Sequence, residues 1–451
     1  MPIVIVADDL TGANDTAAAF VRHGFRAATL LRLQEATCLR ALGYEVVALS
    51  TESRGLSTSE AGRAVSRLFE TFHPGPHDIV YKKIDSALRG PIAAELGALM
   101  EACGRFRRVL VAPAFPAMGR TTVGGQQRID GEPVHLTEMA RDPVSPVRIS
   151  SIPALLEHQW PGKVAYLPLA HVRRGAAAVA EWLSTLEPAV RALAADAETD
   201  GHLEILAEAA LGDPALLLCG TAGLAAALAR QLERRSDRWR DGERGTYDPA
   251  MGERWPGDGG ARPCRTPHGS SRRGLLFVVG SKSSRARAQL DMLHDQAPWV
   301  ARVDVELEQL QESSQGAARA VQEVARKAAA ALRHCGAAAI GVKGAGEGLK
   351  PETITFRLAE VVQHVEEVAP PDTLLLTGGE TAASVLKALG AGALEIVGEH
   401  APGVVVSRIR GGRSEGACVV TKAGSFGRDA LLLELAEAWR RKFGEPAGNT
   451  P

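Results

Sequence analysis

The stretch IVIVADDLTGAND, residues 3–15, holds the pattern that decides the fold. Its first four residues are all β-branched, which predicts a short buried strand. The strand ends at two adjacent carboxylates, Asp8 and Asp9, and a helical pattern follows. A strand that runs directly into a helix is typical of a parallel sheet, in which ligands bind beyond the carboxyl ends of the strands. The residues after each strand are therefore the candidates for the functional site.

The same alternation of strand and helix continues along the chain. In the first half, the patterns predict strands at 46–49, 79–81, 109–111 and 216–219 and helices at 60–72, 92–102 and 222–235. In the second half, they predict strands at 275–279, 337–342, 373–376 and 417–420 and helices at 281–293, 317–334, 351–367, 381–389 and 428–441. This order predicts an α/β protein with a mostly parallel β-sheet, flanked by helices, in each half.

The chain has 451 residues, which is too long for one ordinary core. Residues 234–273 are rich in Arg, Asp, Gly and Pro and contain almost no aliphatic side chains, so this segment cannot bury enough apolar surface to form a core. We predict a first domain at 1–233, a linker at 234–273 and a second domain at 274–451. The arginines of the linker could indicate a nucleic-acid contact, but acidic residues lie between them, and we favour a solvated linker.

Composition excludes several classes of protein. The formal net charge is −1, so bulk electrostatics indicate no nucleic-acid partner. No apolar run is long enough to cross a bilayer. The six cysteines lie far apart and form no CxxC or Cys/His spacing, which argues against a zinc site and a disulfide framework. We expect a cytoplasmic protein without a membrane or nucleic-acid partner, and leave open whether it forms a homo-oligomer.

Charged residues follow the predicted strands of the first half. Asp8 and Asp9 could accept a proton from a substrate hydroxyl or help to hold a metal, or one of them could cap the next helix. After the strand at 79–81, the basic residues Lys82, Lys83 and Arg89 surround Asp85. Such a cluster suits an anionic substrate, although a surface ion-pair cluster would have the same composition.

Two more arginines follow strands of the first half. Arg54 comes after the strand at 46–49 and could join the cationic cluster. Arg120 lies with two threonines in a segment rich in Pro and Gly at 113–125, which we expect to be a shaped loop that contacts a polyanion.

The second half offers three glycine-rich turns between a strand and a helix. They contain Gly280-Ser281, Gly378-Gly379-Glu380-Thr381 and Gly424. Glycine lets the backbone approach a phosphate, and the start of a helix supplies free N–H donors. Three such turns on one sheet predict a nucleotide phosphate site. Neither G-x-x-x-x-G-K-[ST] nor G-x-G-x-x-G occurs in the chain, which disfavours a P-loop kinase and a dinucleotide-dependent dehydrogenase.

Together these motifs resemble those of the four-carbon acid sugar kinases. The matching segments are 7–13 with Asp15, 82–90, 112–122, 220–225, 280–289, 377–381 and 422–427. The chain departs from the family pattern at Ala87, Gly124, Ala286 and Ser425, and none of these departures removes a charged group.

The resemblance implies ATP-dependent phosphorylation of the terminal hydroxyl of a four-carbon sugar acid, in a cleft between the two domains. The charged residues of the first half fit this reaction: we expect Arg54, Lys83 and Arg89 to hold the carboxylate of the substrate, and Asp9 or Asp85 to orient or deprotonate its hydroxyl. The implied substrate-binding residues are Asp8, Arg54, Lys82, Lys83, Arg89 and Arg120, and the implied ATP-binding residues are Ser281, Gly378, Gly379, Glu380, Thr381 and Gly424. Mg²⁺ is expected with ATP, with Asp8, Asp9 and Glu380 as candidate ligands only.

Two other functions stay open. The chain could be another sugar-phosphate enzyme, such as an isomerase or a phosphatase with similar glycine turns. It could also be a sensor that binds a sugar acid and a nucleotide without turnover. The paired carboxylates argue against a sensor, because a binder of an anion gains nothing from nearby negative charge.

Overall fold

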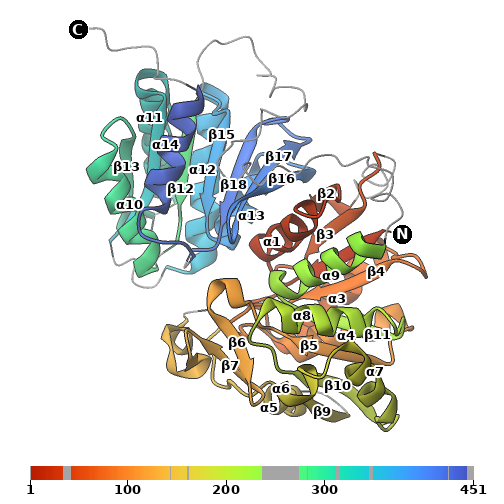
Figure 1. The fold of residues 1–451 in the computed structure, drawn as a ribbon. Helices are drawn as coiled ribbons and strands as arrows, with labels where there is room; N and C mark the ends of the chain where they lie inside the picture. Colours follow the sequence, from red (N-terminus) through yellow and green to blue (C-terminus); the bar gives the residue numbers. More distant parts are fainter. Residues whose placement is uncertain are drawn as a thin grey trace. The chain divides into compact units, whose positions relative to one another are not determined.

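The computed structural model describes residues 2–33, 42–142, 144–159, 162–235, 274–281, 283–310, 314–344, 349–424 and 426–443. The chain divides into two compact units, Met1–Tyr247 and Asp248–Pro451, which we call unit 1 and unit 2 (Figure 1). The predicted linker lies outside the described residues except for its first two, which end a helix at Arg235. The predicted domain boundaries therefore stay a prediction.

Unit 1 contains a parallel sheet with the strand order β2-β3-β1-β4-β11-β5-β10-β9. The strands are β1 (Ile3–Ala7), β2 (Ala27–Leu30), β3 (Val46–Ser50), β4 (Ile79–Lys83), β5 (Arg108–Ala112), β9 (Lys163–Leu167), β10 (Val190–Ala195) and β11 (Leu216–Gly220). Every residue of β1 and of β11 is buried, as expected when helices cover both faces of a parallel sheet.

The helices of unit 1 form two layers. In one layer α1, α9, α8 and α7 contact each other in succession, and in the other α3, α4 and α5 do so. These helices, with the short α6, are α1 (Leu10–Val21), α3 (Thr58–Thr71), α4 (Ile92–Cys103), α5 (Ile152–Gln159), α6 (Leu169–Val172), α7 (Ala176–Thr185), α8 (Asp200–Ala210) and α9 (Ala222–Arg235).

The segment predicted to be a shaped loop has more structure than expected. It contains the 3-10 helix η2 (Pro116–Met118) and the strand β6 (Arg120–Val123). Strand β6 forms a small antiparallel sheet with β7 (Gln126–Ile129) and β8 (Glu132–Pro133), which follow it. The two-residue turn of the hairpin has positive φ angles of 63° at Gly124 and 70° at Gly125, which glycine adopts without strain. The 3-10 helices η3 (Val134–Leu136) and η4 (Glu138–Arg141) follow.

Unit 2 contains a sheet with the strand order β13-β14-β12-β15-β18-β17-β16. The strands from β13 to β18 in this order are parallel, whereas β17 is antiparallel to both of its neighbours. The strands are β12 (Leu275–Val279), β13 (Ala301–Glu306), β14 (Ala337–Lys343), β15 (Thr373–Thr377), β16 (Ala393–Ala401), β17 (Val404–Arg410) and β18 (Cys418–Lys422).

A hydrophobic core joins the sheet of unit 2 to its helices. Phe277 of β12 and Trp439 of α14 belong to one buried cluster, in which α10 packs beside α14. The helices of the unit are α10 (Ser284–Gln296), α11 (Ser314–Cys335), α12 (Pro351–Val368), α13 (Gly379–Ala388) and α14 (Leu431–Phe443), with the 3-10 helix η7 (Leu307–Leu310). The α/β class with a mostly parallel sheet in each half is confirmed.

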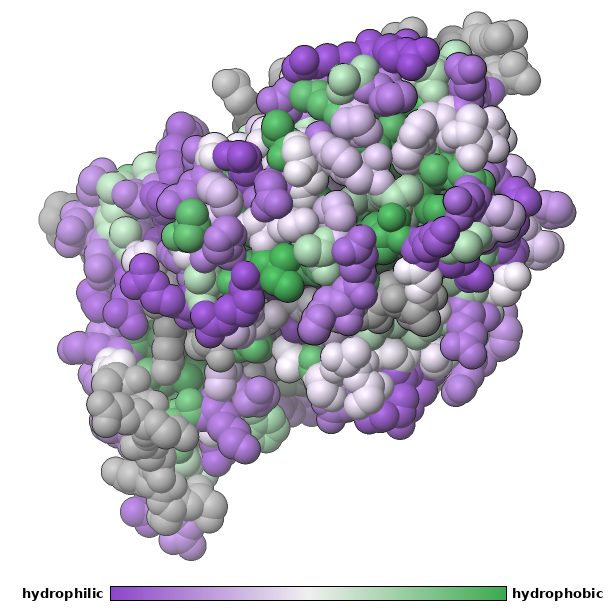
Figure 2. All heavy atoms as spheres, turned by 90° about the horizontal axis from the view of Figure 1, so that it is seen from below, coloured by the Kyte–Doolittle hydropathy of each residue, from purple (hydrophilic) through white to green (hydrophobic). Residues whose placement is uncertain are grey.

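Figure 2 colours one face of the molecule by hydropathy. On the face in Figure 2, hydrophobic side chains are scattered among hydrophilic ones. In the part of the chain that the structure describes, no helix is both long and apolar enough to cross a membrane.

Candidate active site

Arg54 contacts both carboxylates that follow β1. Its Nε donates to Oδ2 of Asp8 at 2.7 Å, and its Nη2 donates to Oδ1 of Asp9 at 2.7 Å. The same Nη2 lies 3.8 Å from Oδ1 of Asp85, which follows β4. Strands β3, β1 and β4 are neighbours in the sheet, so their carboxyl ends bring these residues together. The structure thus brings Arg54 to the carboxylates at the strand ends, and its role in binding a substrate stays a prediction.

Asp9 also caps helix α1. Its Oδ1 accepts a hydrogen bond from the backbone N–H of Gly12 at 2.9 Å, and its Oδ2 accepts one from Thr11 Oγ1 at 2.5 Å. Asp9 therefore caps the helix, which is one of the roles that the sequence analysis considered for it, and the cap holds its carboxylate in place. A Cβ at Gly12 would lie 2.6 Å from Asp9 Oδ1 and 2.8 Å from Lys83 Nζ, so a larger residue here would displace the capping carboxylate or the ammonium group.

A second arginine holds Asp85. Arg89 donates from Nη2 to Oδ1 at 2.9 Å and from Nε to Oδ2 at 3.0 Å, which is a bidentate pair. Oδ2 also accepts from the backbone N–H groups of Ala87 at 3.1 Å and of Arg89 at 3.3 Å. Arg89 continues to Oδ2 of Asp142 at 3.0 Å. Asp142 is not among the residues predicted from the sequence, because it lies 53 positions away from Arg89.

Opposite charges thus alternate through the cluster in the order Asp8/Asp9, Arg54, Asp85, Arg89, Asp142. We call this set the charge chain. Burial alone would raise the pKa of Asp8, but the charges of Arg54 and Lys83 outweigh burial and hold this pKa below its usual value. The same balance, with Arg89 and Arg54 as the main cations, holds the pKa of Asp85 far below its usual range. Both groups are carboxylates at neutral pH.

Lys82 and Lys83 lie in different environments although they are adjacent in sequence. Lys82 is completely buried and forms an ion pair with Glu95 of α4 at 2.8 Å. Ser53, next to Arg54, donates from Oγ to Oε1 of the same glutamate. Lys82 therefore supports the loop that carries Arg54. Lys83 is also buried, but no carboxylate among the described residues lies within 4.0 Å of its Nζ.

The hairpin that begins at Arg120 is tied to this region by two residues that the sequence analysis missed. Gln127 is completely buried and donates from Nε2 to the carbonyls of Ser86 at 2.7 Å and of Pro113 at 3.0 Å. Asp196, at the end of β10, accepts from the N–H groups of the turn at 124–125 at 3.0 and 2.9 Å. Arg120 donates from Nη1 to the carbonyl of Met118, and burial lowers its pKa.

Backbone strain gathers around the same cluster. Among the described residues, positive φ angles outside glycine occur at Glu52 (47°), Leu88 (63°) and Asp130 (50°). Glu52 lies two positions before Arg54, Leu88 precedes Arg89, and the N–H of Asp130 donates to Gly119, beside Arg120. Such conformations cost of order 1–3 kcal/mol each and persist where a functional site holds them.

The glycine turns of unit 2 converge as predicted, because β12, β15 and β18 are neighbours. A Cβ at Gly424 would lie 2.3 Å from Oγ of Ser281, and one at Gly280 would lie 2.3 Å from Oγ1 of Thr381. Gly378 caps α13 with a φ of 98°, which glycine alone adopts easily. The first turn of α13 also contains Gly379 and Glu380, and Glu380 is exposed.

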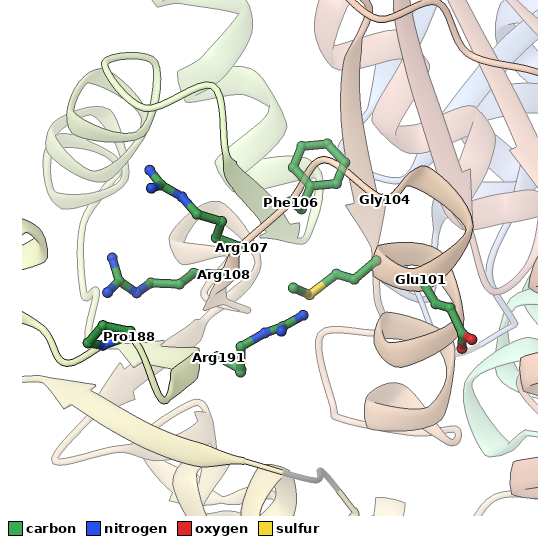
Figure 3. Close-up of a pocket in the computed structure, with 8 residues that line it drawn as sticks. Glu101, Gly104, Phe106, Arg107, Arg108, Pro188 and Arg191 are labelled. Carbon is green, nitrogen blue, oxygen red and sulfur yellow. The ribbon is translucent and has the colours of Figure 1, made fainter.

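A hollow of about 480 Å³ lies at the amino-terminal ends of strands β5 and β10 of unit 1, whereas the charge chain follows the carboxyl ends of strands (Figure 3). Arg107, Arg108 and Arg191 line it. Arg108 donates to the backbone carbonyls of Leu186 and Glu187 and so holds the chain before β10. Ligands of parallel sheets bind at the carboxyl ends of the strands, so we do not place the substrate in this hollow.

Both units match known families. Residues 3–228 match the sugar-binding N-terminal domain, and residues 276–432 match the nucleotide-binding C-terminal domain. The chain is 33% identical over 450 residues to the D-threonate kinase of Bordetella bronchiseptica, with 98% of both chains covered. The chain belongs to the four-carbon acid sugar kinase family.

Two other relatives of this chain are named as kinases of other four-carbon acids. It is 27% identical to the D-erythronate kinase of Heliobacterium modesticaldum, with 94% of each chain covered. It is 31% identical to the 3-oxo-tetronate kinase of Methylobacterium radiotolerans, over 94% of this chain and 95% of that one. A solved structure from Salmonella typhimurium LT2, titled a putative tRNA synthase, covers 96% of this chain and 98% of its own, with a TM-score of 0.72 at 22% identity, and shows the same fold.

Proposed function

We propose that this family kinase transfers the terminal phosphoryl group of ATP to the terminal hydroxyl of a four-carbon sugar acid, such as threonate, erythronate or an oxo-tetronate. The names of its relatives support this substrate class. The observation that carries the proposal is the buried charge chain at the strand ends of the unit that matches the sugar-binding domain. A phosphatase or an isomerase would have no need of a separate nucleotide-binding unit.

We propose that Lys83 and Arg54 bind the carboxylate of the sugar acid. Arg54 donates through Nε and Nη2, and among the described residues its Nη1 makes no hydrogen bond. The ammonium group of Lys83 likewise lacks a carboxylate partner in the described part of the chain. The guanidinium of Arg89 is engaged with Asp85 and Asp142 through Nε, Nη1 and Nη2, so we assign Arg89 a positioning role.

Asp9 is the better candidate for the group that orients and deprotonates the hydroxyl. Oδ2 of Asp85 already accepts three hydrogen bonds, and Arg89 and Arg54 hold its pKa far below its usual range in spite of burial. A proton acceptor with so low a pKa is a weak base. Oδ2 of Asp9 accepts a single hydrogen bond, from Thr11, and keeps a lone pair for the substrate.

The nucleotide would bind at the three glycine turns of unit 2, where N–H groups at the start of α13 can donate to phosphate oxygens. Mg²⁺ bound to ATP usually takes one or two carboxylates and keeps several waters. Asp8 fits such a ligand, because its buried Oδ1 has no hydrogen-bond partner among the described residues. Bound there, the ion would neutralise phosphate charge. As predicted from the sequence, we propose the interdomain cleft as the place of transfer, because both ligands must meet.

The test is ADP release with Mg²⁺-ATP over a panel of D- and L-threonate, D- and L-erythronate and oxo-tetronates, with neutral tetroses as controls. We expect turnover confined to one or two four-carbon acids. Tight binding of an acid and of ATP without ADP release would replace the kinase with the sensor. Release of inorganic phosphate from a sugar phosphate would favour a phosphatase.

Two variants separate the roles of the aspartates. Asp9→Asn keeps the helix cap, since Asn caps as well as Asp, and should lower kcat by roughly 100-fold or more. Asp85→Asn should mainly raise the KM for the acid, because it disturbs both arginines. Asp200→Asn, on the exposed start of α8, is the matched control and should leave both constants unchanged. The opposite result for the first two variants would refute the assignment.

A further inference from the structure

Lys422, the last residue of β18, is a completely buried lysine. No carboxylate among the described residues lies within 4.0 Å of its Nζ. Instead, Nζ donates to the backbone carbonyls of Ala423 at 3.0 Å and of Gly424 at 3.4 Å. The other completely buried lysine of the described chain, Lys82, has Glu95 as its partner. A buried ammonium group without a counter-charge is costly, so Lys422 needs an explanation.

Lys422 joins all three glycine turns of unit 2. Its backbone carbonyl accepts the N–H of Gly378 at 2.9 Å, which holds the turn before α13. Its Nζ holds Gly424, whose carbonyl also accepts from Ser283 Oγ at 3.1 Å. Ser283 Oγ accepts in turn from Ser281 Oγ at 3.2 Å. The lysine therefore stands at the meeting point of the turns where the nucleotide is expected.

The elements packed against β18 supply no counter-charge. Strand β15 has no charged residue, and β17 has Arg408 and Arg410. Helix α13 has Glu380 and Lys387. Helices α10 and α14 form a buried core with Cys418 and Val420 of β18, and their acidic residues are Asp291, Asp295, Glu434 and Glu437. None of these charges shifts the pKa of Lys422. Burial is the cause that lowers this pKa to about 7.

We propose that Lys422 is a further nucleotide-binding residue, whose ammonium group is the counter-charge of the phosphate chain and takes up a proton when the nucleotide binds. This inference rests on the proposed use of ATP. On binding, Nζ would leave the carbonyl of Gly424, which is the longer of its two contacts, for a phosphate oxygen. The ammonium group of a lysine is a point charge, so at this place it can bind a phosphate oxygen although the chain has no P-loop.

The experiment is calorimetric titration of the full chain with Mg²⁺-ATP at pH 8 in two buffers of different ionisation enthalpy, which counts protons taken up. Because the pKa of Lys422 lies at about 7 in the free protein, most of it is neutral at pH 8. The wild type should therefore take up nearly one proton more than Lys422→Met. The variant should also bind ATP roughly 10- to 100-fold more weakly, as expected for the loss of a charged hydrogen bond.

Two further variants keep the test decisive. Lys387→Met, on the exposed side of α13, is the matched control and should equal the wild type in affinity and proton uptake. Lys422→Arg stays charged and should bind ATP without the extra proton uptake. Equal affinity and equal uptake for wild type and Lys422→Met would overturn the inference alone. No binding of ATP by the wild type would overturn the proposed use of ATP, and the inference with it.

Discussion

Replacing Glu95 by Gln tests the buried support beneath the loop of Arg54. The side chain of Lys82 is 0% exposed and that of Glu95 is 1% exposed, so the variant leaves a buried ammonium group without its partner. Glutamine keeps the size of the side chain and an oxygen that can accept from Ser53. Breaking a buried ion pair from one side costs about 3–5 kcal/mol. For a unit of this size, that corresponds to a fall of roughly 6–20 °C in Tm.

The stability loss of Glu95→Gln should also change with pH in a predictable direction. In the wild type, burial lowers the pKa of Lys82, but Glu95 and Asp8 outweigh burial and raise it. Without the negative charge of Glu95, less electrostatic attraction opposes the effect of burial. The pKa of Lys82 in the folded state should therefore fall below its value in the unfolded state. A folded state that binds fewer protons gains stability as pH rises. The stability deficit of Glu95→Gln should therefore shrink from pH 7 towards pH 10.

Urea unfolding at pH 7 and pH 9.5 measures both effects. Glu101→Gln, exposed on the same helix, is the matched control and should change the free energy of unfolding by less than about 0.5 kcal/mol. The double variant Lys82→Met with Glu95→Leu removes both charges and should stay within about 1.5 kcal/mol of the wild type. A loss below about 1 kcal/mol in Glu95→Gln, or a loss independent of pH, would refute the reasoning.

Two other predictions follow from the same contacts. Gly424→Ala puts a Cβ 2.3 Å from Oγ of Ser281, so this variant should raise the KM for ATP at least about tenfold and leave the KM for the acid unchanged. The control is Gly97→Ala, whose Cβ would have nothing within 4 Å; it should keep activity and add about 0.5–1 kcal/mol of stability. An unchanged KM for ATP in steady-state assays would contradict the first. The cations of the charge chain lower the pKa of Asp8 and Asp85 in spite of burial. These two ionised carboxylates therefore stabilise the folded state above about pH 4, and this stabilisation is lost as the pH falls below that value. Urea midpoints from pH 7 to pH 3 should therefore fall less steeply for Asp85→Asn than for the wild type.

The central strands of both sheets could be predicted because they are buried on both faces and read as continuous apolar runs. The predicted strand at 275–279 and the predicted helix at 222–235 agree with β12 and α9 in their bounds. The hairpin of β16 and β17 was missed, because the half-buried second half of β16 mixes Gly, Glu and His with apolar residues. The strands at 120–123 and 126–129 were missed for a similar reason, since their side chains are mostly polar.

The rule that ligands bind at strand ends located most of the candidate site. It found Asp8, Arg54 and Asp85, because each directly follows a strand or the turn after it. It could not find Glu95 or Asp142, which reach the site from a helix and from a distant loop, since partners far apart in sequence leave no local signal. Lys422 did leave a signal, a lysine that ends an apolar strand, but charge at a strand end does not by itself reveal burial.

The charge chain also constrains how this enzyme can diverge. Each inner member neutralises a neighbour on both sides, so exchanging Arg54, Asp85 or Arg89 alone leaves opposite charges stranded in the interior. Such residues should be inherited together and replaced together. A lineage that exchanges one of these three charges would then need a compensating exchange at the residue that pairs with it.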